Sequence, residues 1–183
     1  MRFPSASVTK AMLLVSVLRR AAAKPLDENV RRQLRAMITV SDNDAASAVY
    51  ARVRARGLQS VARAAGMNNF REVGHWAGAR ITAADQARLF LRIDKLVPRV
   101  HRRYARKLLS SIVRPQRWGI APVARRKRLK IFFKGGWRNG VTHQVALLEH
   151  GGRRVALAVL TSGSPSMAYG VETIERIAAR VLP

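Results

Sequence analysis

Cysteine is absent from the 183 residues of this sequence, which excludes disulfide bonds, a thiolate nucleophile and cysteine-ligated zinc. Acidic residues are scarce, at 10 against 35 lysines and arginines, so the formal net charge is +25. No apolar run approaches the roughly 20 residues that a membrane-spanning helix needs, and we expect no membrane span. The hydrophobic content of 48% is nevertheless sufficient for a sizeable buried core.

The excess of positive charge predicts attraction to polyanions, whatever else the protein does. Nucleic acid, anionic lipid or an acidic polymer would be drawn to such a surface at low salt. The basic runs at 101–103 and 125–128 are typical of solvated faces, and the sequence has no glycine-rich phosphate loop, zinc finger or RNA-recognition motif. We therefore predict non-specific polyanion binding without a specific nucleic-acid site. The four histidines lack metal-ligand spacing, so neither a metal nor another cofactor is expected.

The first apolar segment, residues 8–18, allows two interpretations. A positively charged start, this short apolar stretch and the alanines at 21–23 have the outline of a secretory signal peptide. However, Ser16 interrupts the stretch, and Arg19 and Arg20 stand where a signal peptide is usually uncharged. Apolar residues on all sides instead favour a helix that is buried in the core.

Helical patterns dominate the chain up to residue 113, separated by glycines, caps and one loop without a period. The predicted helices cover residues 25–38, residues 45–56, a short segment between Gly57 and Gly66, a segment after the cap Thr82, and residues 101–113. The helix after Thr82 has Ala83, Ala87, Phe90 and Leu91 on one face. The loop without a period spans 67–80, and residues 115–128 are predicted to form an irregular connection.

Strand patterns follow this connection, in three runs at 129–134, 141–150 and 153–161. Gly151 and Gly152, between the last two runs, are typical of a two-residue hairpin turn. A final helix is predicted after the cap at 164–166, and its apolar face carries Val171, Ile174, Ala178 and Val181. The order indicates an α+β fold, with a mainly helical part at 1–127 and a part at 128–183 that holds the antiparallel strands and the C-terminal helix.

Ser7 and Lys10 are the first candidates for chemistry, because they stand three residues apart at the start of the most apolar helix. Burial would lower the pKa of a lysine toward the range in which its amine acts as a base, and a nearby serine would then be an activated nucleophile. The helix N-terminus would supply N–H donors for a developing oxyanion. The simpler interpretation is a capping serine and a surface lysine.

Two further motifs follow in the chain. Ser41-Asp42-Asn43 lies in a loop between helices, and Lys134-Gly135-Gly136 ends the first predicted strand. Together with Ser7-Val8-Thr9-Lys10 they resemble, in order, the S-x-x-K, S-D-N and K-T-G motifs of class A β-lactamases and penicillin-binding proteins. The surrounding stretches at 37–46 and 131–137 are also similar to that family. The resemblance covers essentially the whole chain and implies a helical lobe and an α/β lobe on either side of a cleft.

The resemblance implies a serine acyl-hydrolase whose substrate is a β-lactam or a D-Ala-D-Ala stem peptide of peptidoglycan. Ser7 would attack the substrate carbonyl to form an acyl-enzyme, and Lys10 would take the proton from Ser7. Ser41 would relay a proton to the leaving amine. Family members act outside the cytoplasm, which implies a periplasmic or secreted protein.

The substrate-binding residues are implied by the same resemblance. Asn43 would hydrogen-bond the side-chain amide of the substrate, and Lys134 would hold its carboxylate. Gly136 would line the site on the strand. The backbone N–H groups of Ser7 and Trp137 would form the oxyanion hole.

The sequence departs from the family pattern at three places. The threonine of K-T-G is Gly135, so a hydroxyl that would bond the substrate carboxylate is missing. In the loop at 67–80 the one carboxylate is Glu72, which lacks the Leu-Asn that follows the deacylating glutamate of class A enzymes. We favour a surface role for Glu72 over that of deacylation base. The chain also begins almost at Ser7, whereas family members carry a helix and strands first, so we expect an N-terminally shortened fold with an unpaired sheet edge.

Two alternatives to an efficient lactamase follow from these departures. Without a deacylation base an acyl-enzyme would persist, as in a penicillin-binding protein or DD-peptidase. A non-catalytic protein that keeps the fold and binds anionic polymers through its charge is the second alternative.

Overall fold

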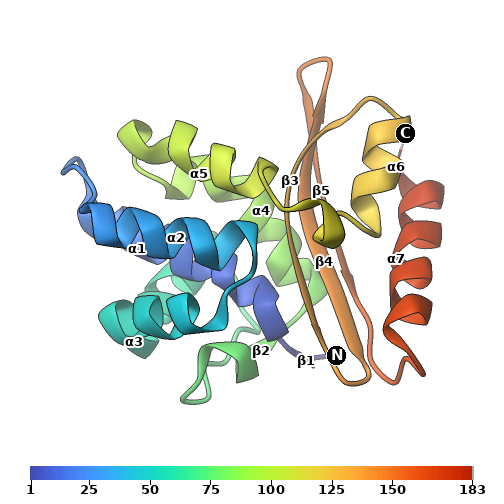
Figure 1. Ribbon diagram of the computed structural model, residues 1–183, viewed down its shortest axis with the longest axis horizontal. Helices are drawn as coiled ribbons and strands as arrows, with labels where there is room; N and C mark the ends of the chain where they lie inside the picture. The colour runs from blue at the N-terminus through green and yellow to red at the C-terminus, as the bar shows by residue number, and fades with distance from the viewer. Residues whose placement is uncertain (183) are drawn as a thin grey trace.

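The computed structural model describes residues 1–182 and consists of a group of helices beside a three-stranded antiparallel sheet, which two further helices cover on its other face (Figure 1). The helices are α1 (Lys10–Ala21), α2 (Glu28–Thr39), α3 (Asn43–Ala65), α4 (Ala83–Leu96), α5 (Arg102–Ser110), α6 (Ile120–Arg126) and α7 (Met167–Val181). The strands are β1 (Phe3–Pro4), β2 (Arg80–Ile81), β3 (Lys130–Arg138), β4 (Val141–His150) and β5 (Arg153–Leu160). Short 3-10 helices are η1 (Ala6–Thr9), η2 (Trp76–Gly78), η3 (Arg99–His101) and η4 (Arg114–Gln116).

Helix α1 lies at the centre of the helical group and is buried on every side from Lys10 to Leu18. Packing against α2, α3 and α4 accounts for this, because a helix that is apolar all round must be enclosed by others. The predicted buried helix is therefore confirmed. None of the helices among residues 1–182 is long and apolar enough to cross a membrane.

Helix α3 has a break within it, but at a different residue from the one predicted. Arg54 has φ 54° and ψ −173°, so two helical segments meet there, whereas Gly57 continues the second segment. A Cβ at Gly57 would lie 2.4 Å from Ser16 Oγ and 2.7 Å from Val53 Cβ. Gly57 is thus required for the close approach of α3 to α1 and does not interrupt the helix.

The sheet has the order β3-β4-β5, with all neighbours antiparallel. Gly151 and Gly152 form the predicted hairpin turn, and both have positive φ, at 53° and 78°. Helices α4 and α5 pack against one face of the sheet, and α6 and α7 cover the other (Figure 1). Within residues 1–182, β5 pairs with β4 alone, and Val155 on β5 is 43% exposed.

Helix α6 was not predicted, since residues 115–128 were expected to be irregular. Gly119, with φ 65°, precedes the helix, and its first N–H is capped from the sheet: Ile120 N donates to Gln144 Oε1 at 2.6 Å. Gln144 Nε2 donates in turn to Trp118 O at 2.8 Å. A cap from β4 leaves no local sequence signal. Although α6 precedes residue 127, it packs beside α7; the division at that residue stays a prediction.

Other element boundaries differ from the predictions in detail. The helix expected over 101–113 ends at Ser110, and the pair β1–β2 was not expected. Leu91 and Val181, which the pattern places on the apolar faces of their helices, are 46% and 58% exposed. In α4 the buried face turns instead toward Leu89, Phe90 and Ile93.

A cluster of charges joins the helical group to the sheet. Arg106 on α5 bonds both Asp94 on α4 and Glu149 on β4, and its guanidinium lies 4.0 Å from the centre of the Phe132 ring. Arg154 on β5 bonds the same two carboxylates. Because planar guanidinium groups bridge several carboxylates at once, this network fixes the sheet against α4 and α5.

Gly57→Ala tests the close approach of α3 to α1. In an exposed helix this change would stabilise by about 1 kcal/mol, but here the contacts with Ser16 and Val53 should lower the free energy of unfolding by about 1–3 kcal/mol. Urea unfolding measures the change. Ser60→Ala, on an exposed position of the same helix, is the control and should change stability by less than about 0.5 kcal/mol. A stabilised Gly57→Ala protein would contradict the packing.

Candidate active site

The segment that carries Ser7 is held at both ends. Before it, Ser5 N donates to Ala79 O at 2.8 Å, and the Ser5 hydroxyl donates to Trp76 O at 3.0 Å. After it, η1 continues directly into α1. Ala6, immediately before Ser7, has φ 44°, a conformation that is costly for a non-glycine residue and that is often found next to reacting groups.

His143 on β4 anchors this segment to the sheet. Thr161 N donates to Nδ1 of His143 at 3.1 Å, so Nδ1 is the acceptor and Nε2–H donates to Pro4 O at 3.0 Å. Burial lowers the pKa of His143, which keeps the ring neutral and this tautomer in place. The His143 imidazole therefore has a structural role: it fixes Pro4, which stands three residues before Ser7.

Lys10, Ser41 and Asn43 form a hydrogen-bonded group at the start of α1. The Lys10 ammonium donates to Ser41 O at 2.5 Å, to Ser41 Oγ at 3.2 Å and to Asn43 Oδ1 at 2.8 Å. Lys134 on β3 reaches the same hydroxyl, donating to Ser41 Oγ at 3.0 Å and to Gly135 O at 2.9 Å. We call Lys10, Ser41, Asn43 and Lys134 the two-lysine cluster.

Burial dominates the electrostatics of the two-lysine cluster. Both lysine side chains have no exposed surface. Desolvation lowers the pKa of Lys10 to about 8, against the opposing effect of the Asp42 carboxylate. Desolvation also lowers the pKa of Lys134 well below its usual range, and the neighbouring charge of Lys10 lowers it further. Lys10 can therefore exchange a proton near neutral pH, and burial disfavours the charged form of Lys134.

The loop between α2 and α3 holds Ser41 in a conformation that suits these contacts. Val40 N and Asp42 N both donate to Ala36 O, which ends α2, and Ser41 between them has φ 60°. The Asp42 carboxylate accepts a bond from Ala45 N at 2.6 Å and so caps α3. Caps on both sides thus support a left-handed serine whose carbonyl and hydroxyl both face Lys10.

Ser7 lies beside β3, on the same side as Lys134. A Cβ at Gly136 would be 2.7 Å from Ser7 N and 2.8 Å from Val8 N, so only glycine allows this approach. Ser7 is half-buried. The structure thus brings Ser7, Gly136 and the two-lysine cluster to one place, although no hydrogen bond joins the Ser7 hydroxyl to Lys10 within residues 1–182.

Two tryptophans line β3 next to Lys134. The indole of Trp118 packs on Gly135, where a Cβ would lie 3.1 Å from two ring carbons, and Trp137 meets Trp118 edge to face with ring centres 5.9 Å apart. Trp118 thus occupies space that the threonine of a K-T-G motif would need. The sequence indicates only a core or cleft-wall position for Trp118, since an isolated tryptophan in an irregular segment does not identify its partner.

The loop at 67–80 presents an aromatic ring to Lys10. Trp76 is buried, and its ring centre lies 4.8 Å from Lys10 Nζ. Glu72 lies outside the two-lysine cluster's hydrogen bonds: its Oε1 accepts from Tyr50 OH at 2.6 Å and from Gly74 N at 2.9 Å. Desolvation and this bond raise the pKa of Tyr50 to about 12. Trp76, for which the sequence indicates only a core or cleft-wall position, is therefore the loop residue next to Lys10.

Across residues 1–182, no group of three or more histidine, aspartate or glutamate side chains could hold a metal ion.

Comparisons with known proteins identify the family and the fold of the chain. The model of the beta-lactamase enzyme family matches residues 29–182. Comparison with curated protein sequences gave no significant match. Among solved structures, the chromosome-encoded beta-lactamase of Vibrio parahaemolyticus has a TM-score of 0.83 at 15% identity, over 100% of this chain and 84% of that one. The beta-lactamase of Sphaerobacter thermophilus has a TM-score of 0.82 at 18% identity, over 99% and 82%.

A class A beta-lactamase from Mycobacterium abscessus is similar as well, with a TM-score of 0.81 at 17% identity, over 100% of this chain and 85% of that chain. The fold is therefore that of the class A β-lactamases, and the predicted α+β arrangement of a helical lobe, a small antiparallel sheet and a C-terminal helix is confirmed. The chain belongs to the beta-lactamase enzyme family. It is a serine β-lactamase-like hydrolase by family and fold.

Burial of the two lysines predicts a stability that increases with pH. The pKa of Lys10 is about 8 in the folded protein against 10.5 ordinarily, so the unfolded chain binds more protons between these values. The free energy of unfolding should rise across this window, by about 3 kcal/mol from Lys10 alone. Lys134 acts in the same direction.

Urea unfolding between about pH 7 and about pH 10.5 measures this rise. Lys10→Met should remove its share, whereas Lys95→Met, at an exposed lysine of α4, should leave the slope unchanged. A free energy of unfolding that falls steadily through this window would contradict the burial of both ammonium groups.

Proposed function

We propose that this protein forms an acyl-enzyme on Ser7 with β-lactams, or with a D-Ala-D-Ala stem peptide, and hydrolyses it slowly. The observation that carries the proposal is the two-lysine cluster, which gathers Lys10, Ser41 and Lys134 beside the Ser7 segment. Membership of the beta-lactamase enzyme family supports the same reaction. A site of this kind needs a serine nucleophile and an amine with a depressed pKa.

In the proposed acylation, the Ser7 oxygen attacks the carbonyl carbon of the lactam, and neutral Lys10 takes the hydroxyl proton. A tetrahedral oxyanion forms and accepts bonds from the N–H groups of Ser7 and Trp137. The carbon–nitrogen bond then breaks, and the Ser41 hydroxyl passes its proton to the leaving nitrogen while the Lys10 ammonium donates the proton taken from Ser7 to Ser41. A pKa of about 8 suits Lys10 to this role, because the neutral amine is then well populated near physiological pH.

Substrate binding is proposed along the free edge of β3, which pairs with β4 on its other side. Lys134 would hold the substrate carboxylate, with Asn43 on its amide. Because burial disfavours the charged form of Lys134, an arriving carboxylate would raise the pKa of this lysine and be bound together with a proton. The indoles of Trp118 and Trp137 would form an apolar wall next to that carboxylate.

Deacylation is the slow step in this proposal. Within residues 1–182, none of the hydrogen bonds of Lys10 is to a carboxylate, and Trp76 is the loop residue against it. The Glu72 carboxylate accepts hydrogen bonds from Tyr50 and Gly74. A hydrolytic water would therefore lack a well-placed carboxylate base. The protein would behave more like a penicillin-binding protein than like a rapid lactamase.

A penicillin should label the protein covalently on Ser7. Intact-protein mass spectrometry after incubation would show one adduct, peptide mapping would place it, and its decay would give the deacylation rate. Ser7→Ala should abolish the adduct, whereas Ser5→Ala, whose hydroxyl bonds backbone carbonyls, should retain it. A folded wild-type protein whose mass does not increase after incubation with the penicillin would refute the acyl-enzyme. The alternative of a non-catalytic protein with this fold would then be favoured.

The rate of acylation should depend on pH through Lys10. Because only the neutral amine accepts a proton and its pKa is about 8, the second-order rate constant should fall about tenfold for each pH unit below that value. Stopped-flow measurements with a chromogenic cephalosporin would give this profile. Lys10→Ala should remove this dependence of the rate constant on pH together with most of the rate. A rate constant that does not change with pH in the wild type would assign the base to another group.

A further inference from the structure

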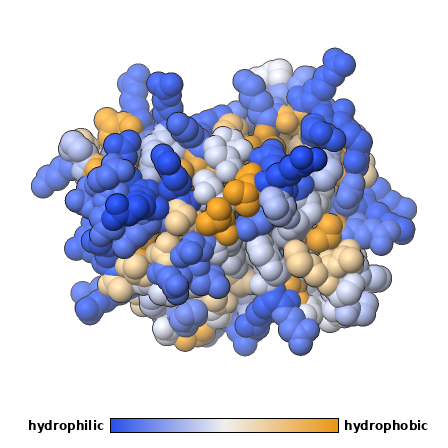
Figure 2. All heavy atoms as spheres, in the orientation of Figure 1, coloured by the Kyte–Doolittle hydropathy of each residue, from blue (hydrophilic) through white to orange (hydrophobic). Residues whose placement is uncertain are grey.

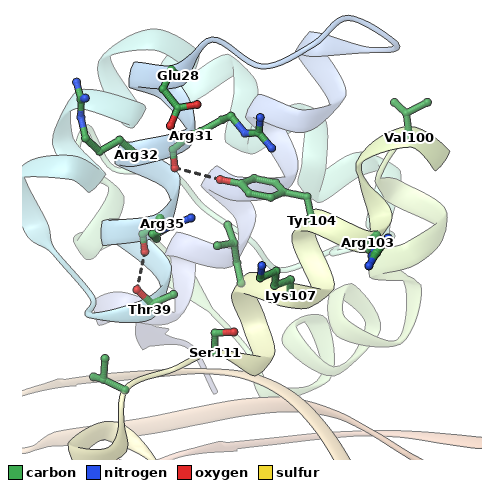
Figure 3. A pocket seen from close by; sticks show the side chains of 12 residues that line it. Glu28, Arg31, Arg32, Arg35, Thr39, Val100, Arg103, Tyr104, Lys107 and Ser111 are labelled. Carbon is green, nitrogen blue, oxygen red and sulfur yellow. Dashed lines mark hydrogen bonds between the residues drawn. The ribbon is translucent and has the colours of Figure 1, made fainter.

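A second surface of the molecule, between α2 and α5, carries charges that the proposed reaction does not use. A groove of about 1010 Å³ separates the two helices, and five cations line it (Figure 3). They are Arg31, Arg32 and Arg35 on α2 and Arg103 and Lys107 on α5. One carboxylate, Glu28, shares this lining.

None of these five cations forms an ion pair with a carboxylate of residues 1–182. Arg106, on the same helix as Arg103 and Lys107, is in contrast neutralised by Asp94 and Glu149. All five side chains in the groove belong to exposed residues. The groove therefore concentrates positive charge that the fold itself leaves uncompensated, and its walls focus that potential.

Tyr104 is the one aromatic ring that lines the groove, and both its hydroxyl and its ring are engaged. It extends from α5 toward α2, where its hydroxyl donates to Arg31 O at 3.0 Å (Figure 3). The Arg31 guanidinium lies over its ring at 5.5 Å from the centre. Burial raises the pKa of Tyr104, and the charges of Arg31 and Arg35 oppose that rise. Because a guanidinium already lies over this ring, a nucleic-acid base gains little stacking surface here, and phosphates are the groups that the groove suits.

A second groove adjoins the first at the end of α5. Its volume is about 830 Å³, and its lining begins at Ser110, next to Ser111 of the first groove. It adds Arg114, Arg117, Arg125 and Lys130. Figure 2 shows hydrophilic side chains spread over the face on which α2 and α5 lie in Figure 1. A succession of cations over two adjoining grooves suits an extended ligand better than a single small anion.

We propose that the α2/α5 groove and its continuation bind a linear phosphodiester polymer, recognised through its phosphates and not through any bases. The groove also adjoins the proposed catalytic cleft. Val113 N donates to Thr39 O at 3.0 Å, and Gln116 Nε2 donates to Val40 O at 2.9 Å, directly before Ser41. A polymer bound here would hold the protein on a polyanionic matrix with its cleft close to that matrix.

The test compares two probes that carry equal numbers of phosphates: oligo(dT) and a base-free oligomer of propanediol phosphate. Fluorescence anisotropy with the full chain should give dissociation constants within about threefold of each other, each weakening with salt. Binding of oligo(dT) without binding of the base-free oligomer would overturn the proposal, because bases would then be recognised.

Two charge-matched triple variants locate the site. Arg35→Gln, Arg103→Gln and Lys107→Gln together remove three groove cations whose side chains make no hydrogen bond or ion pair with residues 1–182. The control, Arg52→Gln, Arg56→Gln and Arg63→Gln, removes three exposed cations of α3. The groove triple should weaken binding at least about tenfold and reduce the salt slope by about two, and the control should change affinity less than about twofold.

Equal weakening by both triples would overturn the proposal in favour of diffuse charge. Circular dichroism and thermal unfolding of both triples verify that the fold is kept. Ser7→Ala should bind both probes like the wild type, so this inference and the proposed acyl-enzyme can fail separately.

Discussion

Two lysine amines buried around one serine are the constraint on which the rest of this molecule depends. Lys10 and Lys134 come from different parts of the chain, and both donate to the Ser41 hydroxyl without a carboxylate between them. Like charges in a desolvated site are unfavourable unless hydrogen bonds satisfy them and their pKa values fall. The left-handed Ser41, the capped loop around it and the close approach of Gly136 to Ser7 all support this cluster. The surrounding core holds in place an arrangement that local preferences would not form.

The sequence predicted what depends on local pattern. The buried helix α1, the strands β4 and β5 and their glycine turn follow from periodicity and turn residues that stand next to one another in the chain. The contacts that give the site its character join distant segments. Trp118 on Gly135 and Trp76 against Lys10 have no local signal. Helix α6 was not predicted for the same reason, since its cap comes from Gln144 on the distant strand β4.

Several of the ten acidic residues stabilise the fold and are therefore not free to neutralise surface arginines. Asp94 and Glu149 join helices to the sheet, and Asp27 and Asp42 cap helices. Because so many carboxylates have such structural tasks, few remain to neutralise the exposed arginines of α2 and α5. The hydrogen bonds of Lys10 in residues 1–182, none of which is to a carboxylate, belong to the same pattern. A shortage of acids thus affects the proposed deacylation and the proposed polymer site alike.

The outer edge of β5, which pairs with no other strand of residues 1–182, has a consequence for how copies of the protein behave together. A free strand edge is a template for pairing with the same edge of a second molecule, and such pairing leads toward aggregation. Arg153 and Arg154 stand at the start of this strand, and every copy carries a net charge of +25. Colloidal repulsion therefore guards an edge that the fold leaves open. Because salt screens that repulsion over about 10 Å at 0.1 M, protection of this edge weakens as the ionic strength of the surroundings rises.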